Sequence, residues 1–110
     1  MSDLQLYMAQ RLTALIMGPL VLVHIAVMIY AVQGGLTASE ILGRTQGSIL
    51  WFVFYGTFVF AVSIHAAIGL RTIFHEWLGL QDKTLNITSL AIGVCLFILG
   101  GRAVLAVTFL

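Results

Sequence analysis

Two histidines, His24 and His65, lie inside long apolar stretches of the sequence, "LVLVHIAVMIY" and "VSIHAAIGLRTI". A neutral imidazole can move a proton, form hydrogen bonds or ligate a metal ion through a ring nitrogen. An unpaired polar group costs several kcal/mol in an apolar medium, so an ionisable side chain inside a membrane segment indicates a function. The structural alternative is a neutral imidazole that bonds to a neighbouring helix.

Small residues flank both histidines. Ala66, Ala67 and Gly69 follow His65, and Ala14, Gly18 and Pro19 precede His24. Residues four apart lie on one face of a helix, so Gly69 leaves room beside His65 for a flat ligand that lies along the helix. The same small residues also permit close helix packing. A porphyrin is a flat ligand of this kind. Its iron binds an imidazole nitrogen, and its plane needs a helix surface without large side chains beside it.

The two histidines are not expected to share one iron. His24 lies 13 residues from Arg11, and His65 lies 6 residues from Arg71, where Arg11 and Arg71 mark the same end of two antiparallel helices. The difference corresponds to about 10 Å of depth at 1.5 Å per residue. Opposite ligands of one metal ion lie only about 4 Å apart. We therefore expect two haems at different depths, each completed by a histidine from another chain.

Other metal chemistry is disfavoured by the single cysteine, Cys95. A structural zinc site takes four Cys or His ligands, which this sequence does not supply. A C-x-x-C-H motif for covalently attached haem is absent from the sequence. Cys95 is interpreted as a small apolar residue of a helix.

The elements that position the histidines are predicted to be membrane-spanning helices. Of the 110 residues, 61% are hydrophobic and 8% are charged, against about 45–50% and about 25% in soluble domains. Three apolar segments, at about 12–32, 48–73 and 85–107, each reach the roughly 20 residues that a helix needs to span a bilayer. All acidic residues lie outside them: Asp3, Glu40, Glu76 and Asp82. The sequence predicts an all-α membrane protein with three helices in a single domain, 1–110, and offers no basic run for nucleic acid.

Basic residues give a prediction of orientation. Arg11, Arg71 and Lys83 lie on one side of the predicted membrane, and Arg44 and Arg102 lie on the other. Because cytoplasmic loops carry more Lys and Arg, this distribution favours a cytoplasmic N-terminus. We expect a multi-pass protein of a bacterial or archaeal cytoplasmic membrane.

Two stretches resemble the membrane anchor subunits of the succinate dehydrogenase and fumarate reductase family. "HAAIGLRTIFHEW" is similar to the family's second-helix signature, with a histidine, a glycine four residues later, and an acid and an aromatic at the cytoplasmic end. "LYMAQRLTALIMGPLVLVHIAVMIY" resembles the helix of diheme members that carries another haem ligand. The resemblance covers nearly the whole chain and is strongest to the second three-helix unit of diheme members.

The resemblance implies a cytochrome b that passes electrons between an iron–sulfur subunit and membrane quinone, in a complex with a flavoprotein subunit. It implies haem b ligated by His65 and by His24, with partner ligands from a second anchor subunit that packs into the same bundle. Haem propionates would contact His75 and Arg71, for which ordinary interfacial anchoring is the alternative. The quinone site would contain Arg11, Glu76, Trp77 and Tyr7. A site near the opposite membrane face is an alternative for the quinone.

Other interpretations stay open at this point. The chain could be a haem-free membrane scaffold or a small transporter subunit with structural histidines, although a small multidrug transporter needs four spans and a buried acid. The cytochrome b of a hydrogenase or formate dehydrogenase also binds haem, usually with more helices. A one-haem anchor, in which His24 is structural, is a further alternative.

Overall fold

The computed structural model describes residues 2–109, and four helices make up almost all of this part of the chain. They are α1 (Asp3–Gly34), α2 (Ala38–Thr45), α3 (Ile49–Leu78) and α4 (Asp82–Thr108). The three long helices are apolar enough to cross a membrane, and the molecule extends 47 Å along its longest axis. The prediction of an all-α membrane protein with three spanning helices is confirmed.

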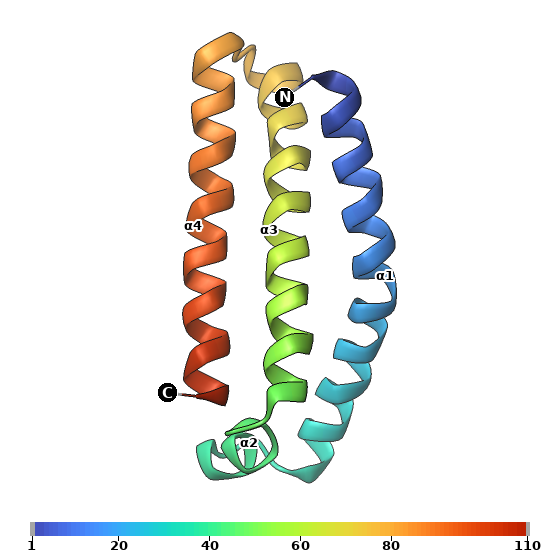
Figure 1. The fold of residues 1–110 in the computed structure, drawn as a ribbon, viewed down its shortest axis with the longest axis vertical. Coiled ribbons are helices and arrows are strands. Elements are labelled where there is room, and N and C mark those ends of the chain that lie inside the picture. The colour runs from blue at the N-terminus through green and yellow to red at the C-terminus, as the bar shows by residue number, and fades with distance from the viewer. Residues whose placement is uncertain (1, 110) are drawn as a thin grey trace.

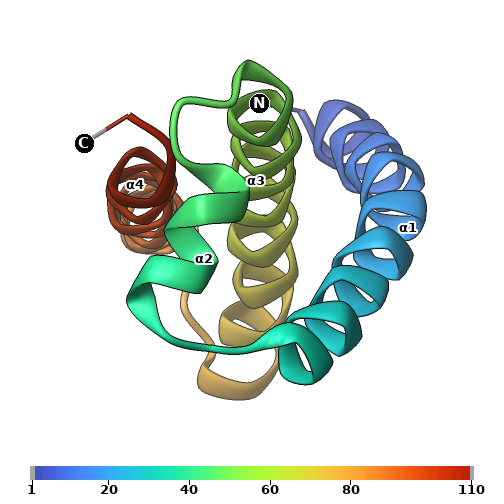
Figure 2. The same cartoon turned by 90° about the horizontal axis from the view of Figure 1, so that it is seen from below.

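The three long helices lie side by side, with α3 between α1 and α4 (Figure 1). The N-terminus and the α3–α4 connection share one end of the bundle, and α2 lies across the other end (Figures 1 and 2). Helix α1 curves along its length, and Pro19 lies near its middle. Proline has no N–H to donate to the carbonyl four residues earlier, which bends a helix at that point.

Helices α1 and α2 begin at side-chain caps. Ser2 and Gln5 form a capping box that satisfies N–H groups at the start of α1. Thr37 accepts a hydrogen bond from the Glu40 N–H at the start of α2. Helix α2 was not predicted, because the sequence analysis considered only segments long enough to span a bilayer and α2 has eight residues.

Helix α3 packs closely against α4 through glycines. A Cβ atom added to Gly100 would lie 2.6 Å from Val59 Cγ1, and one added to Gly93 would lie 3.1 Å from the Ala67 Cβ. Small residues let membrane helices approach until their backbones nearly touch, which gives the van der Waals contact that replaces the hydrophobic effect in lipid. The α3–α4 interface therefore depends on glycine at both heights.

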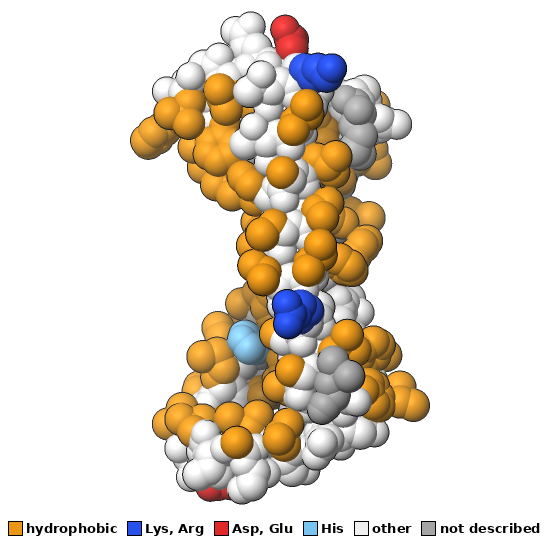
Figure 3. Space-filling model, turned by 90° about the vertical axis from the view of Figure 1, so that its left-hand side faces the viewer, with side chains coloured by type: hydrophobic (Ala, Val, Ile, Leu, Met, Phe, Trp, Pro, Cys, Tyr) orange, Lys and Arg blue, Asp and Glu red, His pale blue; other side chains and the backbone are white. Residues whose placement is uncertain are grey.

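The hydroxyl groups buried in the bundle bond back to their own helices. Ser63, Ser89 and Thr108 each donate to the carbonyl four residues earlier, at 2.7, 2.6 and 2.7 Å. Lipid offers no hydrogen-bond partners, so this pattern satisfies polar groups without water. Large apolar side chains instead face outward, and the face on the α4 side is covered mainly by hydrophobic groups, with acidic ones only at its two ends (Figure 3).

Candidate functional site

His65 lies on α3 and faces α1. Its Nδ1 is 3.2 Å from the hydroxyl oxygen of Thr13, a residue that is only 6% exposed. The Thr13 hydroxyl is also 2.8 Å from the carbonyl oxygen of Ala9 and 3.0 Å from that of Gln10. No hydrogen bond to His65 Nε2 occurs among the described residues. The imidazole is thus bonded at Nδ1 and has no described hydrogen-bond partner at Nε2.

The small residues beside His65 serve helix packing in this structure. A Cβ atom added to Gly69 would lie 3.5 Å from Gln10 Nε2 of α1, and Ala67 contacts the position of Gly93 on α4. Gly69 and Ala67 therefore face neighbouring helices of this chain. Gly18, near the middle of α1, meets no atom within 4 Å of an added Cβ, so the surface of α1 is open at this position.

His24 lies on α1 and faces α3. Its ring stands edge-on to the rings of Phe58 and Tyr55, with centroid distances of 5.1 and 6.1 Å. It also lines a mostly apolar cavity of about 360 Å³ between the three long helices, together with Val62, Leu96 and others. The His24 Nδ1 is buried and has no hydrogen-bond partner among residues 2–109. A buried polar atom without a partner costs about 1–3 kcal/mol, so this nitrogen fits a ligand that binds there.

The two imidazoles lie at clearly different heights in the bundle. His65 is level with Thr13, and His24 follows Thr13 by 11 residues on α1, which is about 16 Å along a helix. Within the described chain, no group of three or more His, Cys, Asp or Glu side chains is placed to hold a metal ion. Each histidine therefore offers this chain's single nitrogen ligand at its own height, which suits an iron that takes its second ligand from elsewhere.

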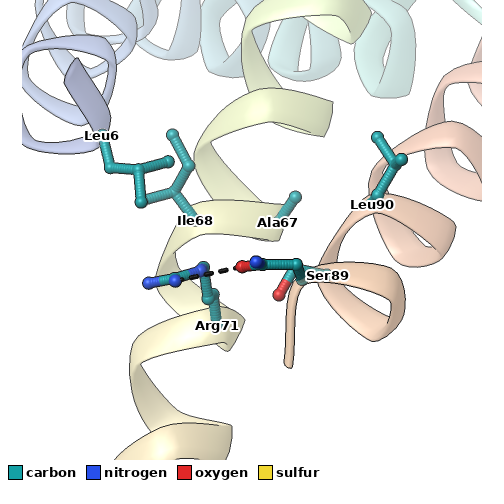
Figure 4. Close-up of a pocket in the computed structure, with 7 residues that line it drawn as sticks. Leu6, Ala67, Ile68, Arg71, Ser89 and Leu90 are labelled. Atoms are coloured by element: carbon teal, nitrogen blue, oxygen red, sulfur yellow. Dashed lines mark hydrogen bonds between the residues drawn. The ribbon is translucent and has the colours of Figure 1, made fainter. Parts of the chain in front are cut away.

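Arg71 and His75 lie near the end of α3 that faces the N-terminus of α1. Arg71 donates a hydrogen bond to Asn86 of α4, at 3.1 Å, and lines a cavity of about 310 Å³ beside Ile68 and Ser89 (Figure 4). The Nδ1–H of His75 donates to the Leu80 carbonyl oxygen at 2.9 Å, because a carbonyl can only accept. Arg71 is half-buried and His75 is exposed at this end of the bundle. Both side chains could therefore contact charged groups of a bound ligand.

The four residues suggested for quinone binding fall into two groups. The guanidinium of Arg11 lies over the ring of Tyr7, 5.8 Å from its centroid. Glu76 and Trp77 are exposed on the last turn of α3. A polar cavity of about 270 Å³ has a different lining, which includes Tyr7 but none of the other three; its lining residues are Asp3, Leu6, Tyr7, Gln10, Ile68, Arg71 and Thr72.

The structure adds three residues that the sequence analysis did not name. Thr13 contacts His65, while Phe58 and Tyr55 contact His24. Thr13 carries a signal that was available in the sequence, since it is a hydroxyl residue inside an apolar segment. The aromatic partners carry none, because aromatic residues are common throughout such segments.

These features define a three-helix membrane protein that presents two interior imidazoles at separate heights. A family model described as the succinate dehydrogenase/fumarate reductase transmembrane subunit matches residues 2–103. The chain belongs to this family, as its sequence motifs predicted. No curated protein and no solved structure gives a match in the other two comparisons.

Proposed function

We propose that this subunit binds haem b through His65 and His24 and passes electrons between an iron–sulfur subunit and membrane quinone. Haem held by His65 and His24 would supply one-electron transfer chemistry. The proposal rests above all on two imidazoles in membrane helices, at heights about three helical turns apart, each with one ring nitrogen that no described residue bonds: Nε2 of His65 and Nδ1 of His24.

His65 is proposed as the ligand of the haem nearer the iron–sulfur subunit. It lies toward the end of the bundle that holds the N-terminus and the α3–α4 connection, the end where Arg11, Arg71 and Lys83 also lie. The excess of basic residues supports a cytoplasmic location for this end. Arg71 and His75 lie within three turns of His65 on the same helix and are proposed to contact haem propionates.

His24 is proposed as the ligand of a second haem, nearer the opposite face. The cavity beside its ring and the unpaired Nδ1 support this assignment. A histidine of a second anchor subunit would complete each haem site, because the two histidines of this chain lie too far apart to hold one haem together. A flavoprotein subunit would complete the complex on the side of the iron–sulfur subunit.

Quinone is proposed to bind near the N-terminal end of α1. Tyr7 and Arg11 supply a phenol and a guanidinium there, and Glu76 and Trp77 lie at the same end of the bundle on α3. Among these groups the Trp77 indole can only donate a hydrogen bond, so it suits a quinone carbonyl oxygen. The polar cavity that Tyr7 shares with Gln10 and Thr72 is adjacent.

The visible spectrum of the whole complex tests the proposal. We expect a reduced-minus-oxidised b-type band in complex purified from membranes, and we expect this subunit expressed alone to hold no stable low-spin haem, because each iron would lack a ligand. In the complex, His24→Ala and His65→Ala should each remove part of this band. Met28→Ala and Phe60→Ala, which remove exposed side chains from the same helices α1 and α3, serve as controls and should leave the band unchanged. Absence of the band from the wild-type complex would instead support a haem-free scaffold.

A further inference from the structure

The hydrogen-bond network around Thr13 determines which nitrogen of His65 carries the proton. The Thr13 hydroxyl has one proton, and its two carbonyl neighbours, Ala9 O at 2.8 Å and Gln10 O at 3.0 Å, can only accept. Both carbonyls lie closer to the hydroxyl oxygen than His65 Nδ1 does, at 3.2 Å. The proton therefore goes to a carbonyl of α1, and the oxygen lone pairs remain for His65.

A hydroxyl oxygen that accepts requires His65 to donate from Nδ1–H. A neutral imidazole carries a single ring proton, so Nε2 is left with a free lone pair, which is the form that ligates a metal ion. Burial strengthens this arrangement, because Thr13 is 6% exposed and water cannot compete for its oxygen. The backbone of α1 thus sets the tautomer of a histidine on α3.

We propose that Thr13 is a positioning residue that holds His65 in the Nε2-ligating tautomer and ring orientation for haem. The inference rests on the proposed function of His65 and adds a residue on a different helix. Hydrogen-bond partners behind a ligating histidine fix its ring and raise its basicity, and their loss typically weakens metal binding by about 10- to 100-fold. The two spanning helices α1 and α3 would then contribute jointly to one axial ligand.

His24 has no hydrogen-bond partner that corresponds to Thr13 at His65. No described residue donates to or accepts from His24, whose ring lies nearly perpendicular to the rings of Phe58 and Tyr55. A change at Thr13 should therefore alter the haem at His65 and leave the haem at His24 as an internal reference.

The test is Thr13→Val in the whole complex, since valine keeps the shape of threonine and removes the hydroxyl. We expect haem at His65 to dissociate at least about 10-fold more readily. We also expect its midpoint potential to rise, because a less basic imidazole stabilises ferric iron less, while the potential of the other haem stays constant. Thr13→Ser keeps a hydroxyl and should restore both properties.

Thr108→Val is the matched control. Thr108 is buried and donates to the carbonyl four residues earlier, as Thr13 does, but it contacts no histidine.

If Thr13→Val does not assemble, Thr13→Ala compared with Thr13→Ser gives the same contrast. Unchanged potential and unchanged haem retention in the hydroxyl-free variants, or a Thr13→Ser variant that behaves like them, would overturn the inference. Retention of all haem in His65→Ala would instead overturn the proposed function of His65.

Discussion

The two ends of the α1–α3 interface hold their histidines by different means. At one end a buried hydroxyl contacts the Nδ1 of His65. At the other, the perpendicular rings of Phe58 and Tyr55 lie beside His24, whose Nδ1 is buried and unpaired. His65 is therefore oriented by a directional bond before any ligand arrives, whereas His24 is restrained only by shape. Two interior histidines of the same helix pair can therefore differ greatly in how far their rings are oriented for ligand binding.

The largest effect on the His24 end is expected from Phe58→Ala. Phe58 provides the nearer aromatic ring, and its removal opens space beside the imidazole. We expect a loss of about 2–3 kcal/mol in stability, less than for a fully buried phenylalanine because Phe58 is only half-buried. Haem content at His24 should fall while the spectrum of the His65 haem stays constant.

The matched control is Phe60→Ala on the same helix, where the side chain is 56% exposed. Chemical denaturation and haem spectra of both variants provide the measurement. Equal haem loss in the two variants would contradict a specific role for the ring of Phe58.

The next largest effect is expected from Gly100→Ala, at the height of the His24 cavity. The new Cβ would lie 2.6 Å from Val59 Cγ1, so α3 and α4 must separate or Val59 must shift. Overpacking costs about 1–3 kcal/mol. Gly101→Ala meets no atom within 4 Å and gains helix propensity of about 1 kcal/mol. Thermal unfolding of the complex should rank Gly101→Ala above Gly100→Ala, and the reverse order would contradict the close α3–α4 approach.

Leucine substitutions of the two histidines should change the stability of the haem-free complex in opposite directions. His24→Leu removes a buried unpaired nitrogen and should raise stability by about 1–2 kcal/mol. His65→Leu removes the partner of Thr13 and should lower stability by about 1 kcal/mol. Melting temperatures of complex from haem-deficient cells provide the measurement. Shifts of the same sign at both positions would show that the two environments do not differ as described.

The smallest effect is expected from Ser63→Ala, two residues before His65. This buried hydroxyl donates only to the Val59 carbonyl of its own helix. Its loss should cost less than about 1 kcal/mol and leave the potential of the His65 haem unchanged. A shift in that potential comparable to the shift in Thr13→Val would mean that any buried hydroxyl near His65 has the same influence.

The spanning helices and their interior histidines were predictable because hydropathy over about 20 residues is a strong local signal. Helix α2 carried a weaker one, the Thr37 cap with Glu40 three residues later, which a search for capping motifs would find. The contact between Thr13 and His65 could not be predicted from the sequence, because the register of α1 against α3 is set by packing between residues 52 positions apart. For the same reason the sequence did not show that Gly69 and Ala67 face other helices of this chain.

The count of haem b per complex, by the pyridine haemochrome method, tests the central claim most directly. We predict two haems in the wild type, one in His65→Ala, one in His24→Ala and none in the double variant. An unchanged count in His24→Ala with complete loss in His65→Ala would support the one-haem alternative, in which His24 is structural. A count that His65→Ala does not change would contradict the assignment of His65 as a haem ligand.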